Sequence, residues 1–131
     1  MLPSTIKRRR ILIVDDEPDI TLTLRIGLEE NEFEVYTFND PVEALSNFKV
    51  DYYDLLLLDI KMPRMSGFKL YEEIKKIDDD VKVCFMTAYE IYYDEFRRLF
   101  PKLNLSCFAN KPISIDTLSK LLYEELKTTS T

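Results

Sequence analysis

Apolar and polar residues alternate in blocks along this chain, and the blocks follow two different periods. Continuous apolar runs end abruptly in acidic residues: Ile11–Val14 is followed by Asp15, and Leu55–Leu58 is followed by Asp59. Unbroken runs of this length are typical of strands that are buried on both faces, as in a parallel sheet. By the same criterion, further strands are predicted at Val35–Phe38, at Val81–Met86 and around Phe108 and Ala109.

Between these strands, apolar residues recur every three or four positions, which is the spacing of one face of a helix. Helices are predicted from the spacing of Ile20, Leu24, Gly27 and Leu28; of Val42, Leu45 and Phe48; of Leu70, Ile74 and Ile77; and of Ile115, Leu118, Leu121, Leu122 and Leu126. A tyrosine-rich helix is predicted from about Ile91 to Phe100, where Pro101 should end it. Five strand–helix repeats with short connections predict an α/β fold, a three-layer sandwich around a doubly wound parallel sheet.

The predicted elements form one domain. A length of 131 residues suits a single domain with its own core. We place this domain at residues 10–127, after a basic lead-in at 1–9 and before a polar tail at 128–131, and we expect no output domain after the last helix. The run Lys7–Arg10 is interpreted as a solvated lead-in, and contact with a nucleic acid or an acidic partner is the alternative.

Composition narrows the classes of function. The chain is 46% hydrophobic and 32% charged, with a net charge of -6, which favours a soluble globular protein and argues against binding nucleic acid through the whole surface. It has no apolar stretch of membrane-spanning length and no signal peptide, so we expect a cytoplasmic protein with no membrane contact. The absence of histidine excludes His-based catalysis. The two cysteines, Cys84 and Cys107, are expected to be small buried thiols, and a disulfide or redox pair is the alternative.

Polar residues with a shared chemistry follow the predicted strands. Asp15, Asp16 and Asp59 come at the carboxyl ends of two strands, and ligands of doubly wound sheets bind at that edge. Three carboxylates gathered there would repel one another unless a cation lay among them, and Mg²⁺ prefers such oxygen ligands. Thr87 and Lys111 follow two more strands. Carboxylates, a hydroxyl and a lysine around one crevice predict a site for a divalent metal and a phosphoryl group.

Four motifs in this order resemble the receiver domain of two-component response regulators. They are Ile11-Leu12-Ile13-Val14-Asp15-Asp16-Glu17, Leu58-Asp59-Ile60-Lys61-Met62-Pro63-Arg64-Met65-Ser66-Gly67, Met86-Thr87-Ala88 and Lys111-Pro112. Each motif stands at the end of a predicted strand, and the resemblance covers the chain from Arg10 to about Leu126. It implies a CheY-like, flavodoxin-like sheet of five parallel strands in the order 2-1-3-4-5. In that order the first and third strands are neighbours, so their terminal aspartates can converge.

The resemblance implies a phosphoacceptor and a metal site. Asp59 would accept a phosphoryl group from the phosphohistidine of a sensor histidine kinase or a phosphotransfer protein. Asp15, Asp16, Asp59 and the backbone carbonyl of Lys61 would bind Mg²⁺ or Mn²⁺. Such a protein is a signalling domain and not an enzyme on other substrates, since it catalyses only its own phosphorylation and dephosphorylation. Gly67 is expected to relieve a tight backbone at the start of the following helix.

The resemblance also assigns the residues that would hold the phosphoryl group and respond to it. Thr87 would donate a hydrogen bond to the phosphoryl oxygens, together with the backbone N–H of Ala88. Lys111 would form an ion pair with Asp59 or its phosphate, and Pro112 would follow a cis peptide bond that aims Lys111 into the pocket. Phe108 occupies the place of a switch aromatic that is often Tyr in the family, so its coupling to Thr87 would operate by packing.

The segment between Thr87 and Lys111 departs from the family pattern. Phe100-Pro101-Lys102-Leu103-Asn104-Leu105 replaces the Gly-Ala pair that usually precedes the fifth strand, and the aromatic residues Tyr89, Tyr92, Tyr93 and Phe96 gather nearby. Exposed tyrosines suit a protein interface. We therefore expect a downstream protein, or a second copy of the chain, to bind the face from Tyr89 to Phe108. Tyr89 and Lys61 flank the site, and a bulky Tyr89 predicts slow autodephosphorylation.

Three other functions compete with a phosphorylation-controlled switch. A Mg²⁺-dependent phosphatase with an aspartate nucleophile would have a second carboxylate two residues after Asp59, where this chain has Lys61. A P-loop nucleotide binder is disfavoured because the chain has only two glycines. A phosphorylation-independent binding module would keep the fold but usually loses one of the site residues. Direct binding of nucleic acid is the output least expected, and whether the chain is single-domain or part of a longer regulator stays open.

Overall fold

A five-stranded sheet forms the centre of the protein in the computed structural model, which describes residues 7–88, 92–102 and 108–127. The strands are β1 (Arg9–Val14), β2 (Phe33–Phe38), β3 (Leu55–Asp59), β4 (Lys82–Thr87) and β5 (Phe108–Asn110). The helices are α1 (Pro18–Glu30), α2 (Pro41–Ser46), α3 (Gly67–Lys75), α4 (Tyr92–Leu99) and α5 (Ile115–Lys127). Strands and helices alternate along the described residues, as the sequence pattern predicts.

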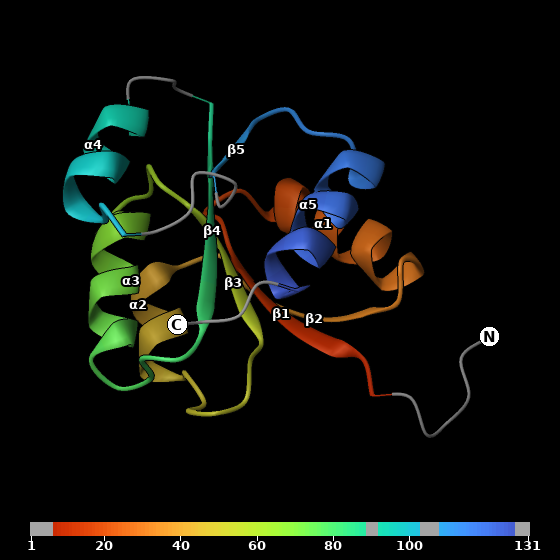
Figure 1. Cartoon of the computed structure of the whole chain (residues 1–131), viewed down its shortest axis with the longest axis horizontal. Helices are drawn as coiled ribbons and strands as arrows, with labels where there is room; N and C mark the ends of the chain where they lie inside the picture. Colours follow the sequence, from red (N-terminus) through yellow and green to blue (C-terminus); the bar gives the residue numbers. More distant parts are fainter. Residues whose placement is uncertain (1–6, 89–91, 103–107, 128–131) are drawn as a thin grey trace.

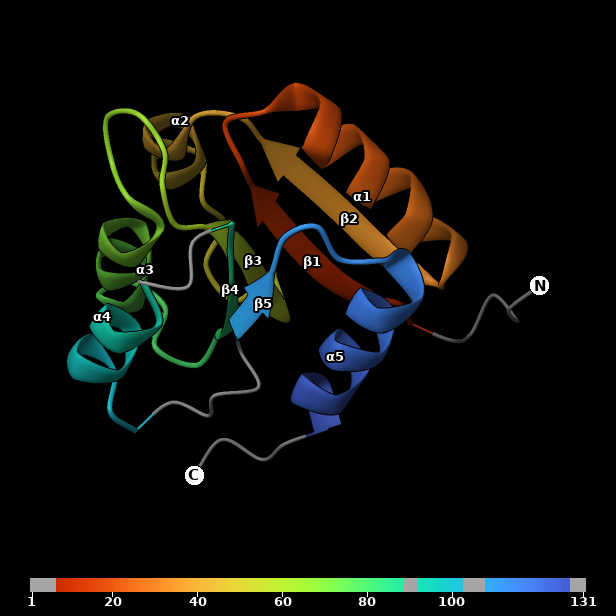
Figure 2. The same cartoon turned by 90° about the horizontal axis from the view of Figure 1, so that it is seen from above.

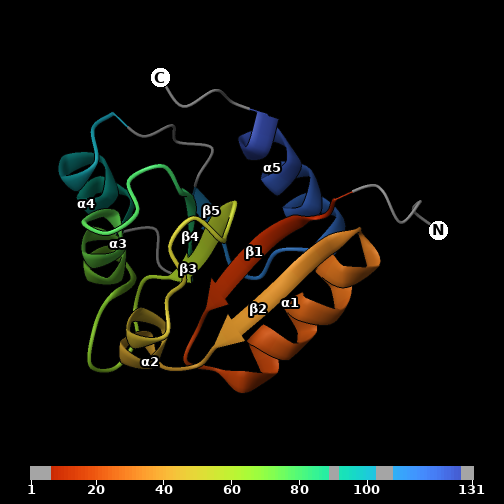
Figure 3. The same ribbon diagram turned by 90° about the horizontal axis from the view of Figure 1, so that it is seen from below.

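All the strand pairs are parallel, and the order in the sheet is β2-β1-β3-β4-β5. Helices α1 and α5 cover one face of the sheet, and α2, α3 and α4 cover the other (Figure 1). Figures 2 and 3 show the same two groups of helices on opposite sides of the sheet when the molecule is seen from above and from below. The predicted three-layer, doubly wound fold and its strand order are confirmed.

Side chains of each central strand contribute alternately to two cores. In β1, Leu12 and Val14 pack into the core under α2 and α3, whereas Ile11 and Ile13 pack into the core under α1 and α5. The four leucines of β3 divide between the same two cores, and none is exposed to solvent. Burial on both faces explains why these strands are continuous apolar runs, since neither face can carry a polar residue at low cost.

Helix starts follow the predicted capping residues. The Asp40 side chain accepts a hydrogen bond from the Val42 N–H (3.1 Å), and Pro41 begins α2. Ser114 Oγ accepts from the Thr117 N–H (3.2 Å) before α5. Such caps satisfy amide groups that have no partner within the helix. The fourth helix ends at Leu99, before Pro101, as predicted.

Two expectations about helix faces are wrong. The fully buried side chains of α2 are Pro41 and Ala44, whereas Val42, expected to face the core, is only half-buried. Ile77 was expected on the buried face of α3, but the helix ends at Lys75 and Ile77 is 49% exposed. Its N–H bonds the carbonyl of Ile74 in the closing turn, which carries the side chain out of the helical spacing.

The basic run is part of the fold and not only a solvated lead-in. Strand β1 begins at Arg9, one residue before the expected boundary. Each described arginine of the run has an acidic partner: Arg8 pairs with Glu32 (3.3 Å), Arg9 with Asp54 (4.0 Å) and Arg10 with Glu34 (2.8 Å). The Arg10 guanidinium also lies 4.0 Å from the centre of the Tyr52 ring. Arg8 and Arg9 are exposed, which agrees with a solvated lead-in, whereas Arg10 is half-buried, and neighbouring elements supply acidic partners to all three.

Several expectations concern residues outside the described ranges. Cys84 is a buried free thiol in β4, as expected, but Cys107 lies outside the described residues. So do Tyr89, Leu103, Asn104 and Leu105, and the aromatic interface therefore stays a prediction. Among the helices of the described ranges, none combines the length and the apolar character that crossing a membrane requires.

Candidate functional site

An open pocket of about 490 Å³ lies where the parallel strands end. Its walls come from loops after β1, β3, β4 and β5, which meet because parallel strands bring their carboxyl ends to one edge of the sheet. The lining residues are Asp16, Glu17, Asp59, Lys61, Met62, Pro63, Thr87, Ala88 and Lys111. Sequence-predicted site residues from four separate segments are thus brought together.

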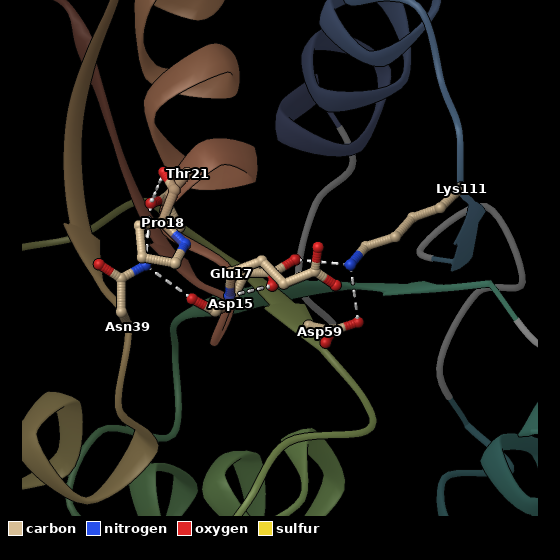
Figure 4. A network of polar contacts seen from close by, with 7 residues as sticks. All are labelled: Asp15, Glu17, Pro18, Thr21, Asn39, Asp59 and Lys111. Atoms are coloured by element: carbon tan, nitrogen blue, oxygen red, sulfur yellow. Dashed lines mark hydrogen bonds and ion pairs between the residues drawn. The ribbon is translucent and has the colours of Figure 1, made fainter.

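Asp15 is the fully buried acid of this site, and every polar group of the residue has a partner. Its backbone N–H donates to the carbonyl of Phe38 (3.2 Å). Its Oδ1 accepts from the Glu17 N–H (3.0 Å), and its Oδ2 accepts from Lys111 Nζ (2.6 Å). Figure 4 shows the two contacts of the carboxylate together with the amide of Asn39, which donates to the Asp15 carbonyl (2.8 Å). The Asp15 carboxylate is therefore fixed in direction.

The acidic cluster contains a residue that the sequence analysis did not select. Asp15, Asp16 and Glu17 can each place one carboxylate oxygen within 4.8 Å of the others. Glu17 was overlooked because it follows the two aspartates at a helix start, where an acid is expected for capping alone. Close carboxylates of this kind are the oxygen donors that hard divalent cations prefer. The donor set thus fits Mg²⁺ or Mn²⁺, with Asp59 across the pocket and outside this closest group.

Asp59 ends β3 and is 6% exposed. Burial of the carboxyl group, reinforced by the negative charge of Asp15, raises the pKa of Asp59 to about 6, although Lys111 acts in the opposite direction. Lys111 Nζ lies 3.2 Å from Asp59 Oδ1. A pKa of about 6 leaves Asp59 ionised at neutral pH, next to the Lys111 ammonium.

Lys111 bridges two of the predicted acids and not Asp59 alone. Its Nζ is closer to Asp15 Oδ2 (2.6 Å) than to Asp59 Oδ1 (3.2 Å). Burial lowers the pKa of Lys111, but the two carboxylates outweigh burial and raise it overall, so the side chain is an ammonium ion. The Lys111–Pro112 peptide bond is cis, as expected, and the Lys111 N–H donates to the Thr87 carbonyl (2.8 Å).

Of the remaining predicted residues, Lys61, Thr87 and Ala88 line the same pocket, and Phe108 does not. Thr87 is buried at the end of β4, Ala88 follows it at the surface, and Lys61 is exposed on the loop after β3. Phe108 is buried in the core under α2 and α3, in register with Phe85 of β4. The coupling of Phe108 to Thr87 and its operation as a switch stay predictions.

Replacement of Asp59 by asparagine should stabilise the metal-free protein at neutral pH. The pKa of about 6 in the folded state exceeds the ordinary 3.8, so the folded protein prefers protonated Asp59. That preference stabilises the fold below pH 3.8 and is lost as the pH rises through about 6. Asp59→Asn should therefore raise the free energy of unfolding above pH 6 by about 1–2 kcal/mol. This gain is smaller than the full pKa shift implies, because solvent in the open pocket screens the charge.

Urea unfolding with EDTA at pH 4 and pH 7.5 measures this difference. The gain should be present at pH 7.5 and nearly absent at pH 4. Asp79→Asn, which removes an exposed carboxylate on the loop before β4, is the control and should change stability little at either pH. An Asp59→Asn variant that is less stable than wild type at pH 7.5 would contradict the role of charge repulsion in the pocket.

Comparison with known proteins agrees with the geometry. The family model described as "Response regulator receiver domain" matches residues 11–123. A crystal structure of the response regulator protein TrrA from Thermotoga maritima, in complex with Mg²⁺-BeF, superposes with a TM-score of 0.76 at 34% identity, covering 88% of this chain and 97% of that one.

Two curated relatives are named as regulators of transcription. "Probable transcriptional regulator ycf27" of Cyanophora paradoxa is 31% identical over 124 residues, 95% of this chain and 51% of that protein. "Transcriptional regulatory protein PrrA" of Mycobacterium leprae is 39% identical over 79 residues, 60% of this chain and 34% of that protein. The match thus spans about a third to a half of these relatives.

Proposed function

The chain belongs to the response regulator receiver domain family of two-component systems, and from this premise we propose that it is a cytoplasmic switch controlled by phosphorylation of Asp59. The observation that carries the proposal is the position of Asp59: it is buried at a strand end and faces the Lys111 ammonium across an acidic pocket. A surface aspartate would have neither the cation nor the walls that hold a phosphoryl donor in line.

Chemically, an Asp59 carboxylate oxygen attacks the phosphorus of a phosphohistidine. A new P–O bond forms as the P–N bond breaks, and the electron pair of that bond stays with the departing imidazole of the partner. Asp59 must be ionised to attack, and a pKa of about 6 leaves it ionised at neutral pH. Because phosphoryl transfer requires positioning and charge stabilisation more than covalent chemistry, the fixed walls of the pocket are the main contribution of the protein.

Residues of this chain would stabilise the negative charge on the transferred phosphoryl group. Lys111 lies between Asp15 and Asp59 and is placed to move toward the incoming phosphoryl oxygens. Thr87 and Ala88 also line the pocket, and the Thr87 hydroxyl and the Ala88 N–H can donate hydrogen bonds to the same oxygens. When bound, Mg²⁺ supplies further positive charge, held by Asp15, Asp16, Asp59 and the carbonyl of Lys61, and Glu17 is close enough to assist.

Two kinds of protein partner are proposed, one that donates the phosphoryl group and one that responds to it. The donor is a sensor histidine kinase or a phosphotransfer protein. The output is a downstream protein, or a second copy of the chain, bound by the face from Tyr89 to Phe108 when Thr87 and Phe108 respond to phosphate. Control of transcription, which the names of the relatives suggest, would pass through such a contact. Direct binding to nucleic acid is disfavoured by the net charge of -6.

Intact-mass spectrometry tests this proposal directly. The chain is incubated with phosphoramidate or acetyl phosphate, with Mg²⁺ or with EDTA, and the acyl phosphate is trapped with borohydride for peptide mapping. We expect one phosphoryl group, dependent on Mg²⁺, at Asp59, and none in Asp59→Asn. A folded wild-type chain that acquires no phosphoryl group from these donors or from a phosphohistidine protein would reject the proposal and favour a phosphorylation-independent binding module.

A further inference from the structure

Asn39 is the first residue after β2, and its side-chain amide bonds two different segments of the site. The Nδ2 group donates to the backbone carbonyl of Asp15 (2.8 Å) and to Thr21 Oγ1 (2.9 Å). An amide nitrogen carries two hydrogens, so both bonds form at once. Thr21 is buried in α1, and its hydroxyl in turn donates to the Pro18 carbonyl (3.1 Å). One side chain thus ties the end of β1 to the first turn of α1.

The carbonyl that Asn39 holds lies in the peptide group that joins Asp15 to Asp16. Because a peptide group is planar, fixing its oxygen fixes the orientation of the bonds on both sides of it. The preceding peptide is fixed as well, since the Asp15 N–H donates to the Phe38 carbonyl (3.2 Å). Consecutive residues at the end of β2 therefore hold Asp15 from both of its backbone polar groups.

From this geometry we propose that Asn39 is a positioning residue for the acidic pocket, which it serves by holding the Asp15–Asp16 peptide so that both carboxylates face the metal. The inference rests on the proposed function, because it concerns the same metal site. Asn39 touches neither the pocket nor the phosphoacceptor, and Figure 4 shows it on the far side of Asp15 from Lys111 and Asp59. It acts through its bonds to the Asp15 carbonyl and to Thr21 in the first turn of α1.

The residue after Asn39 contacts a second loop that lines the pocket, the loop after β3. Asp40 caps α2 and forms an ion pair with Arg64 Nη1 (2.5 Å) on the loop after β3. The turn of Asn39 and Asp40 therefore contacts both loops that carry predicted metal ligands. The amide bond is the part of this turn that reaches the acidic residues, because the Arg64 pair is exposed and surface pairs contribute little.

Mg²⁺ affinity of Asn39→Ala, measured without any phosphodonor, tests the inference. The dissociation constant is obtained from amide chemical shifts of the ¹⁵N-labelled chain during titration with Mg²⁺. Loss of a bond that orients metal ligands typically costs about tenfold in affinity, and we expect about that increase in the dissociation constant. The phosphorylation rate with phosphoramidate should fall at low Mg²⁺ and approach the wild-type rate at saturating Mg²⁺.

Asn47→Ala is a matched control. Its Nδ2 donates to the Glu43 carbonyl (2.9 Å) at the end of α2, so the variant removes the same kind of side-chain-to-backbone bond away from the site. It should leave Mg²⁺ affinity unchanged even if it lowers stability. Equal affinity in Asn39→Ala and wild type, or equal weakening in both variants, would overturn the inference while leaving the proposed function intact. A wild-type chain that binds no Mg²⁺ would overturn both.

Discussion

Replacing Gly67 by alanine is expected to lower the free energy of unfolding by about 3 kcal/mol, at the upper end of the cost of overpacking a core. A β-carbon at Gly67 would lie 2.2 Å from the carbonyl oxygen of Asp59, 3.0 Å from its carbonyl carbon and 3.1 Å from Ile60 Cα. All three are backbone atoms at the end of a buried strand, so no side chain can rotate away. The Gly67 N–H also donates to the Ile60 carbonyl (2.8 Å), which holds the two segments together.

Gly27→Ala is the matched control for this prediction. A β-carbon at Gly27 would also meet close neighbours, the Cδ1 (2.5 Å), Cγ1 (2.6 Å) and Cγ2 (3.0 Å) atoms of Ile115, but these belong to one side chain and not to the backbone. Alanine inside α1 further gains about 1 kcal/mol of helix propensity. Urea unfolding should therefore show a smaller loss for Gly27→Ala, where one side chain must shift, than for Gly67→Ala, where the backbone must shift. Equal losses would mean that the close contact of Gly67 with the Asp59 backbone does not determine the loss of stability.

A shift of the loop after β3 would reach the site itself, because Gly67 contacts the backbone of the phosphoacceptor. The requirement for glycine is a matter of close approach, since neither glycine of the chain has a positive φ. The position of Gly67 before a helix predicts a tight backbone there, and the structure identifies the group that the glycine must accommodate. That group, the Asp59 carbonyl, comes from eight positions earlier in the chain and is not visible from local turn preferences.

The layers and the place of the site follow directly from the sequence. A strand such as Leu55–Leu58, apolar at every position, can only lie in the middle of a sheet that is covered on both faces. Its terminal polar residue, Asp59, must then stand at the edge where the other strands end. The ends of helices were less predictable: the spacing of Leu70 and Ile74 continues to Ile77, but a closing turn, not the apolar pattern, decides where α3 stops.

The partners of polar side chains could not be predicted in the same way. Lys111 was assigned to Asp59, yet its shorter contact is with Asp15, because the choice depends on side-chain directions in two loops 96 residues apart. The pairs of Arg8, Arg9 and Arg10 depend on the register of β1 against β2 and on the loop before β3. Asn39 has no periodic signal at all, since one polar residue after a strand is ordinary.

Replacing Lys111 by methionine should slow phosphorylation of the Mg²⁺-loaded protein by about 100-fold or more. The loss of a preorganised group that faces developing charge typically costs about 10²–10³ in rate. Without the ammonium, Asp15 and Asp59 also repel each other unopposed, so the pKa of Asp59 should rise further above its present value of about 6, and less of the carboxylate form remains to attack. Both effects act in the same direction on the rate.

The same substitution should destabilise the metal-free protein but affect the Mg²⁺-bound protein much less. The Lys111 side chain is 17% exposed and forms an ion pair with the buried Asp15. Its removal therefore leaves a buried charge uncompensated, at a cost of about 2 kcal/mol, a value reduced because the pocket is open. A divalent cation among the acids would replace the lost charge. Mg²⁺ should consequently stabilise Lys111→Met more than it stabilises wild type.

Phosphoramidate-driven adduct formation followed by intact mass gives the rate, and urea unfolding with and without Mg²⁺ gives the stability. Lys111→Arg separates the effect of charge from that of position. It keeps the positive charge, so it should retain most of the stability. Its planar guanidinium cannot occupy the position of the ammonium between two carboxylates, so its phosphorylation rate should lie between those of wild type and Lys111→Met. A Lys111→Met protein that is phosphorylated at the wild-type rate would show that the ammonium holds the pocket together and takes no part in the transfer. Equal responses of Lys111→Met and wild type to Mg²⁺ would instead show that the metal and the lysine do not share the charge of Asp15 and Asp59.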